Sequence, residues 1–369
     1  MVHEASLKVS DELKQKILRH IEATGPMSIA EYTHICMSDP KDGYYQQQHP
    51  IGRAGDFITA PEISQMFGEL IAVWCIEAWR QMGEPGAFNL IELGPGRGVL
   101  MADLLRATQS VPKFVEAATI TLVENSPKMR ELQHEKLGEQ CTWASDISKI
   151  PAGPSIFIAN GFLDVLPFRQ YVKHKSQWVE RAIGANAEFS KLEFTISTGS
   201  IDSRALPEGS ETEPDGAVFE IAPAREAIMQ MVAEHVKEYS GTALLIDYGH
   251  AISGFGDTFQ AVSKHEFTDP LATPGKADLT NHVDFFPLLK VAETAGCHPF
   301  PILTQGKFLL ALGLLERAGT LGHGEDEATQ ARLKSEAERL ALPGEMGDLF
   351  KCLAFASPKM PLPPFAIDD

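Results

Sequence analysis

A short apolar run that leads into three closely spaced glycines constrains this chain more than any other feature. Residues 89–100 read Asn-Leu-Ile-Glu-Leu-Gly-Pro-Gly-Arg-Gly-Val-Leu, which predicts a buried strand, a tight turn and the start of a helix. Glycine lets a backbone turn sharply and approach a ligand closely, because no Cβ intrudes. The turn therefore indicates either a ligand site or a purely structural connection.

The spacing of these glycines argues against a dinucleotide site. The dinucleotide fingerprint is G-x-G-x-x-G, whereas here Gly98 follows Gly96 after one residue and Val99 stands where the third glycine of that fingerprint belongs. A nicotinamide dehydrogenase is therefore disfavoured. A different nucleotide-like ligand fits the turn better.

Short apolar runs alternate with helical patterns after residue 88, which is typical of a mostly parallel sheet with helices on both faces. Ser126 and Pro127 mark the start of one of these helices. We therefore predict an α/β domain with a Rossmann-like sheet over residues 85–369. Its expected strands are Phe88–Leu93, Thr119–Val123, Cys141–Ala144, Ser155–Ala159, Thr242–Asp247 and Leu349–Ala356.

Two stretches depart from this alternation. Residues 1–84 predict an N-terminal helical extension, and residues from about 168 to 240 predict a β-rich insertion. The helices expected in the extension start at Ser10, at Ser28 (a capping box with Glu31) and at Ile63, with a loop over Met37–Pro61. The insertion should hold strands at Phe168–Lys173, Gln177–Ile183 and Leu192–Ile196, with helices following at Pro223–Tyr239 and His282–Ala295.

Charge and composition narrow the class of partner. The chain has 32 basic and 50 acidic residues, and a net charge of −18 repels a phosphate backbone, so nucleic acid is not expected as a partner. Apolar runs are too short to span a bilayer, and acids near the start argue against a targeting signal, so no membrane insertion is expected. Five scattered cysteines predict neither a disulfide framework nor a metal site.

Polar residues follow three of the expected strands, at the carboxyl edge where open α/β sheets bind ligands. Glu124 ends the second strand, where a carboxylate can accept hydrogen bonds from both ribose hydroxyls. Asp146 and Ile147 follow the third strand, and Asn160 and Asp164 follow the fourth. Each acid also suits a solvated loop or a turn cap. Their combination with the glycine turn favours a ribose-bearing ligand.

With these residues the chain resembles the MidA-like family of S-adenosylmethionine-dependent methyltransferases, which includes mitochondrial complex I assembly protein arginine methyltransferases and bacterial relatives. The resemblance extends over nearly the whole chain. Its marks are Gly55–Ser64, Phe67-Gly68, Glu92–Gly98, Asn160–Pro167, Asp247–Gly249, Thr304–Gly306 and Met346–Phe350. Two positions depart from the family pattern: Gly161 stands where an acid is expected, and Val165 stands where alanine is usual.

The resemblance implies a class I methyltransferase fold, S-adenosylmethionine as cofactor, and Gly55–Ser64 as a loop over that cofactor. It also implies an arginine-bearing protein substrate, a complex I subunit where the source has one. The location would be the mitochondrial matrix in eukaryotes or the cytoplasm in bacteria. The expected cofactor-binding residues are Asp56, Phe57, Thr59, Glu92, Gly94, Pro95, Gly96, Gly98, Glu124, Asp146, Ile147 and Asn160.

An arginine acceptor sets a chemical requirement. Its guanidinium has a pKa above 12, so its nitrogen is a poor nucleophile unless carboxylates orient it and accept its protons. The candidate carboxylates are Asp164, Glu220 and Asp247, although Glu220 also suits the approach to a helix and Asp247 the anchoring of a turn. An alternative is a non-catalytic assembly or scaffold protein that kept a methyltransferase fold, since fold alone does not establish chemistry.

Overall fold

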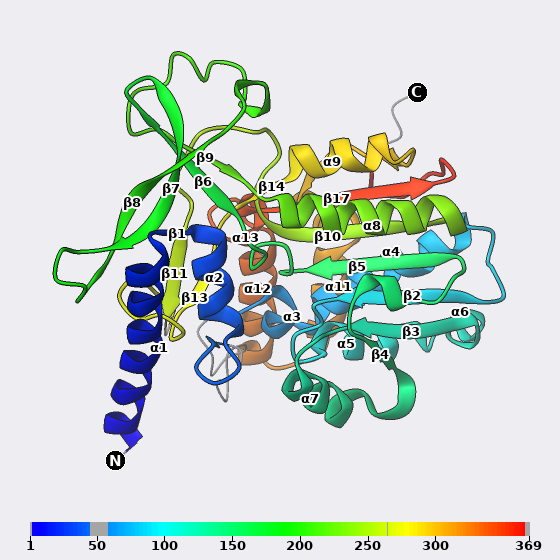
Figure 1. Ribbon diagram of the computed structural model, residues 1–369. Helices are drawn as coiled ribbons and strands as arrows, with labels where there is room; N and C mark the ends of the chain where they lie inside the picture. The colour runs from blue at the N-terminus through cyan, green and yellow to red at the C-terminus, as the bar shows by residue number, and fades with distance from the viewer. Residues whose placement is uncertain (1, 45–57, 264, 366–369) are drawn as a thin grey trace. The chain divides into compact units, whose positions relative to one another are not determined.

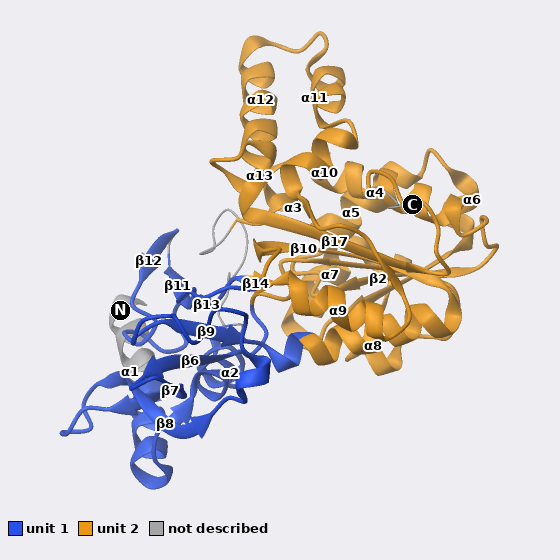
Figure 2. Ribbon diagram, turned by 90° about the horizontal axis from the view of Figure 1, so that it is seen from above, with its two compact units in different colours: residues 1–57, 165–225, 253–282 blue, residues 58–164, 226–252, 283–369 orange. Residues whose placement is uncertain are grey.

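The computed structural model describes residues 2–44, 58–263 and 265–365, and the chain divides into two compact units. Unit 1 comprises residues 1–57, 165–225 and 253–282, and unit 2 comprises residues 58–164, 226–252 and 283–369. Figure 2 colours the two units separately. The chain therefore passes between the units several times, and each unit is assembled from segments that are distant in sequence.

This division differs from the expected boundaries at residue 85 and at about 168–240. Most of the N-terminal extension groups with the insertion because β1 (Met27–Ser28) pairs antiparallel with β7 (Gln177–Ala185). The insertion itself ends at residue 225, and a second segment, 253–282, joins it in unit 1. Residues 58–84 of the expected extension belong to unit 2 instead.

Unit 2 is built on a nine-stranded sheet with the order β15-β17-β10-β5-β2-β3-β4, in which β14 also pairs with β10 and β16 with β17. Strands β4, β3, β2, β5 and β10 are parallel, and β17 is antiparallel to β10. The strands are β2 (Phe88–Leu93), β3 (Ala118–Val123), β4 (Thr142–Ala144), β5 (Ser155–Asn160), β10 (Gly241–His250), β14 (Val283–Asp284), β15 (His298–Pro299), β16 (Leu303–Thr304) and β17 (Phe350–Ser357).

Helices cover both faces of this sheet. Helices α8 and α9 lie on one face, and α4 and α5 lie on the other (Figures 1 and 2). The helices of this unit are α3 (Ala60–Ile63), α4 (Gln65–Gln81), α5 (Val99–Thr108), α6 (Pro112–Ala117), α7 (Pro127–Leu137), α8 (Pro223–Tyr239, whose first three residues belong to unit 1), α9 (Phe285–Thr294), α10 (Gln305–Ala311), α11 (Leu314–Gly322), α12 (Glu327–Ala341) and α13 (Met346–Leu349). No helix of the described part of the chain is long and apolar enough to cross a membrane.

The order of strands creates a switch point beside β2. The chain runs outward from β2 to β3 and β4, and then returns so that β5 pairs with the other edge of β2. Open α/β sheets bind ligands outside the carboxyl ends of the strands at such a reversal. The glycine turn after β2 and the loop after β5 are therefore both at the position expected for a ligand site.

Unit 1 combines two helices with two antiparallel sheets. A five-stranded sheet has the order β1-β7-β6-β9 with β8 beside β7, and a three-stranded sheet has the order β12-β11-β13. The remaining elements are α1 (Val2–Thr24), α2 (Ile29–Ser38), β6 (Arg169–His174), β8 (Leu192–Ser200), β9 (Val218–Ile221), β11 (Gln260–Ser263), β12 (Glu266–Thr268) and β13 (Asp278–Thr280).

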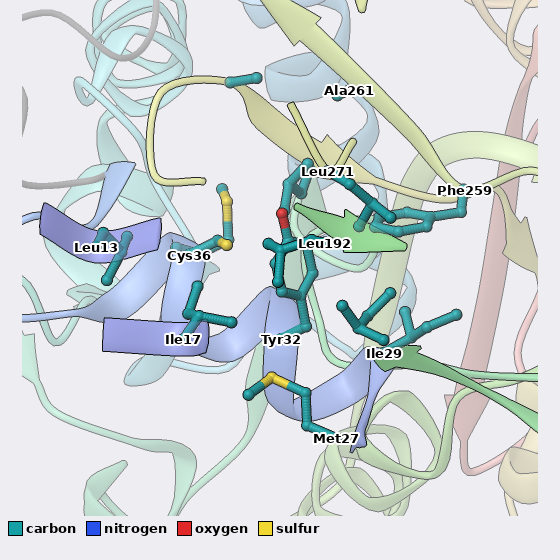
Figure 3. Packing of buried hydrophobic residues seen from close by; sticks show 14 of the residues in the cluster. Leu13, Ile17, Met27, Ile29, Tyr32, Cys36, Leu192, Phe259, Ala261 and Leu271 are labelled. Atoms are coloured by element: carbon teal, nitrogen blue, oxygen red, sulfur yellow. The ribbon is translucent and has the colours of Figure 1, made fainter. Parts of the chain in front are cut away.

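One hydrophobic cluster joins the parts of unit 1. Figure 3 shows Ile17 of α1, Tyr32 of α2 and Phe259 before β11 within this cluster, and all three are buried. The Tyr32 hydroxyl donates a hydrogen bond to the Pro270 carbonyl at 2.7 Å. The segment that returns at residue 253 thus supplies part of the core on which the N-terminal helices pack.

The first helices differ from the sequence prediction. Helix α1 begins at Val2 rather than at Ser10, because the residues before Ser10 include good helix formers such as Ala5 and Leu7. The helix expected over Ile63–Met82 is divided at Ser64, whose hydroxyl accepts a hydrogen bond from the Met66 N–H at 3.3 Å and caps α4.

Two other segments also differ. Residues 283–284 form β14 beside β10 before α9 starts at Phe285, because Asp284 caps that helix through the Phe286 N–H at 3.1 Å. The three-stranded sheet between Gln260 and Thr280 was not expected from the sequence. Its strands have three or four residues each, too short to show a clear period.

Candidate functional site

The turn after β2 has the backbone that its glycines predict. Gly94, Gly96 and Gly98 have φ values of +61°, +51° and +74°, a left-handed region that favours glycine. The Gly98 N–H donates to the Pro95 carbonyl at 2.8 Å, and Gly98 caps α5. A Cβ on Gly94 would lie 2.6 Å from Cδ2 of Phe162. The turn is thus closely packed against the loop that follows β5.

Glu92 lies in β2, two residues before the turn. Its side chain is only 3% exposed, and Oε2 is buried with no hydrogen-bond partner among the described residues. Burial raises the pKa of Glu92 to about 8. An unpaired buried carboxyl oxygen is costly, so its presence beside a glycine turn points to a ligand that supplies a donor or a positive charge.

Glu124 follows β3, beside the turn in the sheet order. Its Oε1 accepts from the Ser126 N–H at 2.8 Å, and its Oε2 accepts from Nε2 of Gln133 at 3.3 Å. Burial raises the pKa of Glu124, while these hydrogen bonds and the charge of Arg130 act in the opposite direction. The carboxylate is therefore fixed in one orientation at the carboxyl edge of the sheet.

Gln133 is a residue of this site that the sequence reasoning missed. It lies on α7, is fully buried, and donates from Nε2 to the Gly96 carbonyl at 2.7 Å. A signal was available, because Met129, Gln133 and Leu137 recur every four residues and form the buried face of the helix. A polar residue within an otherwise apolar helical face is the kind of position that warrants a functional explanation.

Asp146 and Ile147 follow β4. Asp146 is exposed and accepts hydrogen bonds from the Ser148 N–H at 2.9 Å and from the Ser145 hydroxyl at 3.0 Å, whereas Ile147 is buried. The Ser148 and Ser145 hydroxyls, with the Ser148 N–H, lower the pKa of Asp146. Asp146 therefore caps the short turn of 3₁₀ helix at Ile147–Lys149, the turn-capping alternative that the sequence left open.

The loop after β5 carries a second unpaired buried atom. Oδ1 of Asn160 is buried with no hydrogen-bond partner among the described residues. The next residue, Gly161, has φ of +61°, and its N–H donates to the Ile246 carbonyl at 3.0 Å. The departure from the expected acid at position 161 therefore occurs where the backbone favours glycine.

Asp164 and Asp247 come together at the carboxyl ends of β5 and β10. Oδ2 of Asp247 accepts from the N–H groups of Leu163 and Asp164, at 2.9 and 3.2 Å, and Oδ1 accepts from the Tyr248 N–H at 2.9 Å. The Tyr248 hydroxyl donates to Oδ2 of Asp164 at 2.9 Å. Asp247 is fully buried, so its carboxylate holds the backbone that presents Asp164.

Glu220 lies in β9 and belongs to unit 1. Its Oε1 accepts from Gln170 Nε2 at 2.7 Å and from the Thr258 N–H at 2.9 Å, and its Oε2 accepts from the Thr258 hydroxyl and from Asn281 Nδ2 at 2.8 Å. All of these partners are in unit 1. Glu220 is therefore held by a network within unit 1, whereas Asp164 and Asp247 belong to unit 2.

Of the loop expected over the cofactor, Asp56 and Phe57 lie outside the described residues. Thr59 is partly exposed and precedes α3. On α3, Oε1 of Glu62 pairs with NH1 of Arg97, in the middle of the glycine turn, at 3.5 Å. This ion pair connects α3 to the turn.

A family model of S-adenosyl-L-methionine-dependent methyltransferases matches residues 70–303. A mitochondrial protein arginine methyltransferase NDUFAF7 from Xenopus laevis is 35% identical, over 93% of this chain and 84% of its own. The human protein of that name is 33% identical over 92% and 82%. The chain belongs to this family of methyltransferases.

A solved structure supports the same assignment. The crystal structure of a COG1565 superfamily member from Burkholderia thailandensis, bound to S-adenosyl-homocysteine, aligns with a TM-score of 0.84 at 25% identity. The alignment covers 95% of this chain and 93% of that one. The expected class I methyltransferase fold, with a mostly parallel sheet and an inserted β-rich segment, is therefore confirmed.

This methyltransferase uses S-adenosylmethionine, and its residues fit that cofactor. When bound, S-adenosylmethionine supplies a methyl group on a positively charged sulfonium. Gly94, Gly96 and Gly98 have left-handed backbone and no Cβ, so a ligand can approach the turn closely, and the buried carboxyl of Glu92 offers an acceptor beside it. The carboxylate of Glu124 lies after the neighbouring strand, where a ribose is bound in folds of this kind.

Proposed function

We propose that this methyltransferase transfers methyl groups to arginine of a protein. The observation that supports this most is the similarity, over more than nine-tenths of the chain, to relatives named protein arginine methyltransferase. A buried carboxylate at the carboxyl end of the sheet, Asp164, adds chemical support because a guanidinium must be oriented and must lose a proton. Nothing in the comparisons favours the alternative of a non-catalytic scaffold.

We assign the cofactor to the carboxyl edge of β2, β3, β4 and β5. Glu92 and the turn Gly94–Gly98, including Pro95 and Gly96, take its amino-acid part, and Glu124 accepts hydrogen bonds from its ribose. Asp146 and Ile147 take its adenine, and Asn160 lies beside the transferred group. Two observations support this assignment. Strands β5, β2 and β3 are neighbours at the point where the strand order reverses. Glu92 and Asn160 each have a buried side-chain oxygen with no hydrogen-bond partner among the described residues.

We assign different roles to the two carboxylates after β5 and β10. Asp247 is a positioning residue, because its two oxygens accept three backbone N–H groups. Asp164 is the residue that orients the acceptor, and the Tyr248 hydroxyl holds one of its oxygens. Alignment of acceptor and methyl group in a closed site can lower the barrier by up to about 7–11 kcal/mol.

We further propose that the protein acceptor is a subunit of respiratory complex I, where the source organism has one. The family resemblance and the mitochondrial location in the relatives' names support this. The same names favour mitochondria over the cytoplasm as the location. The net charge of −18 is compatible with a cationic protein substrate and unfavourable for nucleic acid.

Isotopically labelled S-adenosylmethionine tests this function. Purified protein is incubated with a cell lysate and the labelled cofactor, and mass spectrometry locates the label. We expect the label on arginine of a protein. Label on lysine, on a small molecule or on RNA, and never on arginine, would refute the substrate while leaving the methyltransferase assignment in place.

The variant Asp164→Asn tests the role of the Asp164 carboxylate. Asparagine keeps an oxygen that accepts from the Tyr248 hydroxyl but loses the charge that pairs with a guanidinium. The variant should bind the cofactor as the wild type does and lose most of the transfer. Wild-type transfer by Asp164→Asn would remove Asp164 from the mechanism.

A further inference from the structure

Gln133 contacts three separate parts of the proposed cofactor site. Its Nε2 donates to the Gly96 carbonyl at 2.7 Å and to Oε2 of Glu124 at 3.3 Å. Its Oε1 accepts from the indole N–H of Trp143 at 2.8 Å. Gly96 lies in the glycine turn, Glu124 follows β3, and Trp143 lies in β4, so one buried amide joins the regions assigned to the amino-acid part, the ribose and the adenine.

The neighbours of this amide fix its orientation. A carbonyl and a carboxylate face its nitrogen, and both can only accept hydrogen bonds. The indole N–H of Trp143 faces its oxygen and can only donate. If the amide were reversed, acceptors would face an acceptor and a donor would face a donor. Gln133 therefore has a single orientation in which all three bonds form.

We propose that Gln133 is a positioning residue that holds the Glu124 carboxylate against the glycine turn, so that both are ready to receive the cofactor's ribose and amino-acid part. This inference rests on the proposed assignment of Glu124 to the ribose. Glu124 is held from two directions, by the Ser126 N–H on Oε1 and by Gln133 on Oε2. Gln133 also donates to the Gly96 carbonyl. The same side chain therefore fixes the position of the Glu124 carboxylate relative to the glycine turn.

Two substitutions at position 133 separate this role from simple packing. Gln133→Glu keeps the shape of the side chain but places a carboxylate against the Glu124 carboxylate and the Gly96 carbonyl. Gln133→Met keeps an unbranched, helix-favouring side chain of similar size without any donor. Thermal unfolding checks that each variant folds. If Gln133→Glu does not fold, the ligand affinities of Gln133→Met decide whether the proposal holds.

The surface provides a matched control. On α8, Nε2 of Gln230 donates to Oε1 of Glu234 at 2.6 Å, so Gln230→Glu also places a new carboxylate against an existing one. It changes the net charge by the same amount as Gln133→Glu. Affinity for the cofactor product should stay at the wild-type value in Gln230→Glu.

The readout is a ratio of affinities for two ligands. Calorimetry measures the dissociation constants of S-adenosyl-homocysteine and of its analogue lacking both ribose hydroxyls. In the wild type the hydroxyls should improve binding by about ten- to a hundredfold, the range for hydrogen bonds to a charged group. In both Gln133 variants this ratio should fall by about tenfold or to near one, because Glu124 no longer holds its orientation.

The outcomes distinguish this inference from the assignment on which it rests. If the wild type does not discriminate between the two ligands, the ribose role of Glu124 fails and the inference fails with it. If the wild type discriminates and Glu124→Ala does not, but the Gln133 variants keep the full ratio, only the inference about Gln133 is overturned. Equal weakening of both ligands would also overturn it, since a merely structural role acts on both alike.

Discussion

At the scale of single residues, Glu124 gives the most direct test of the cofactor assignment. The change Glu124→Ala should weaken the binding of S-adenosylmethionine by about 1.5–3 kcal/mol, because hydrogen bonds to a charged group are lost. The free energy of unfolding of the ligand-free protein should change by only about 1 kcal/mol, because the loss of the bonds to the Ser126 N–H and to Gln133 is offset by removal of a carboxylate that is costly to desolvate. Calorimetry and urea unfolding measure the two effects.

The control for this change is Glu139→Ala, whose carboxylate is 96% exposed in the 3₁₀ turn Gly138–Gln140 that follows α7. It should bind the cofactor with wild-type affinity. If Glu124→Ala binds normally but unfolds easily, Glu124 is a structural residue and the ribose assignment is wrong.

Glu92 gives a test through pH. Burial raises its pKa from about 4.5 to about 8, so between these values the folded protein keeps a proton that the unfolded chain releases. This proton contributes fully to the free energy of unfolding below about pH 4.5. The contribution is lost as pH rises through about 8, and the free energy of unfolding falls by at most about 1.4 kcal/mol per pH unit.

The comparison is between the wild type and Glu92→Gln, which cannot titrate. Urea unfolding of the ligand-free proteins at pH 5, 6, 7 and 8 should show a steeper loss of stability in the wild type. Parallel curves for the two proteins would contradict the unpaired, buried state of this carboxyl group.

How far single residues could be predicted depended on whether their role is local. Glu92 and Glu124 could be proposed from the sequence because an acid beside a glycine turn, or at the end of the next strand, is defined by spacing alone. For Gln133 the sequence offered only a polar position on an apolar helical face, since its three partners come from different elements and meet only after folding. The difference between Asp247 and Asp164 was equally hidden, because it depends on which backbone N–H groups each carboxylate receives.

At the scale of elements, the central strands were the best predicted. Strand β2 has the expected bounds, and β5 differs by one residue, because strands buried on both faces are mostly apolar. Boundaries failed where a single polar residue decided them, as with the caps Ser64 and Asp284. The short strands between Gln260 and Thr280 were not predicted at all, because their pairing is not encoded locally.

The glycine turn is the element whose geometry the function most needs. Gly96 has φ of +51°, where a β-branched residue is strained, and its carbonyl accepts from Gln133. The change Gly96→Val should cost about 1–3 kcal/mol of stability and abolish cofactor binding, because the side chain intrudes where the ligand approaches. Thermal unfolding with and without S-adenosylmethionine measures both effects.

Gly344→Val is a suitable control, since a Cβ at Gly344 would meet nothing within 4 Å. It should keep the full thermal shift on addition of S-adenosylmethionine. If Gly96→Val also kept that shift, the cofactor would have to bind elsewhere.

At the scale of the whole molecule, the sequence predicted the class of fold but not how the chain is divided. The N-terminal helices and the inserted strands form unit 1 through long-range pairing, such as Met27 opposite Ile183. Contacts of this kind leave no periodic signal in either segment. The candidate carboxylates were divided in the same way, with Asp164 and Asp247 in unit 2 and Glu220 in unit 1.

The most direct test of the central claim is a calorimetric titration of the purified protein with S-adenosyl-homocysteine, with NAD as the control ligand. On the proposed assignment, the glycine turn and the carboxylate of Glu124 bind the amino-acid part and the ribose of a single adenosine ligand. We predict binding of S-adenosyl-homocysteine at one site per chain and no binding of NAD. Binding of NAD alone, or of neither ligand, would contradict the account.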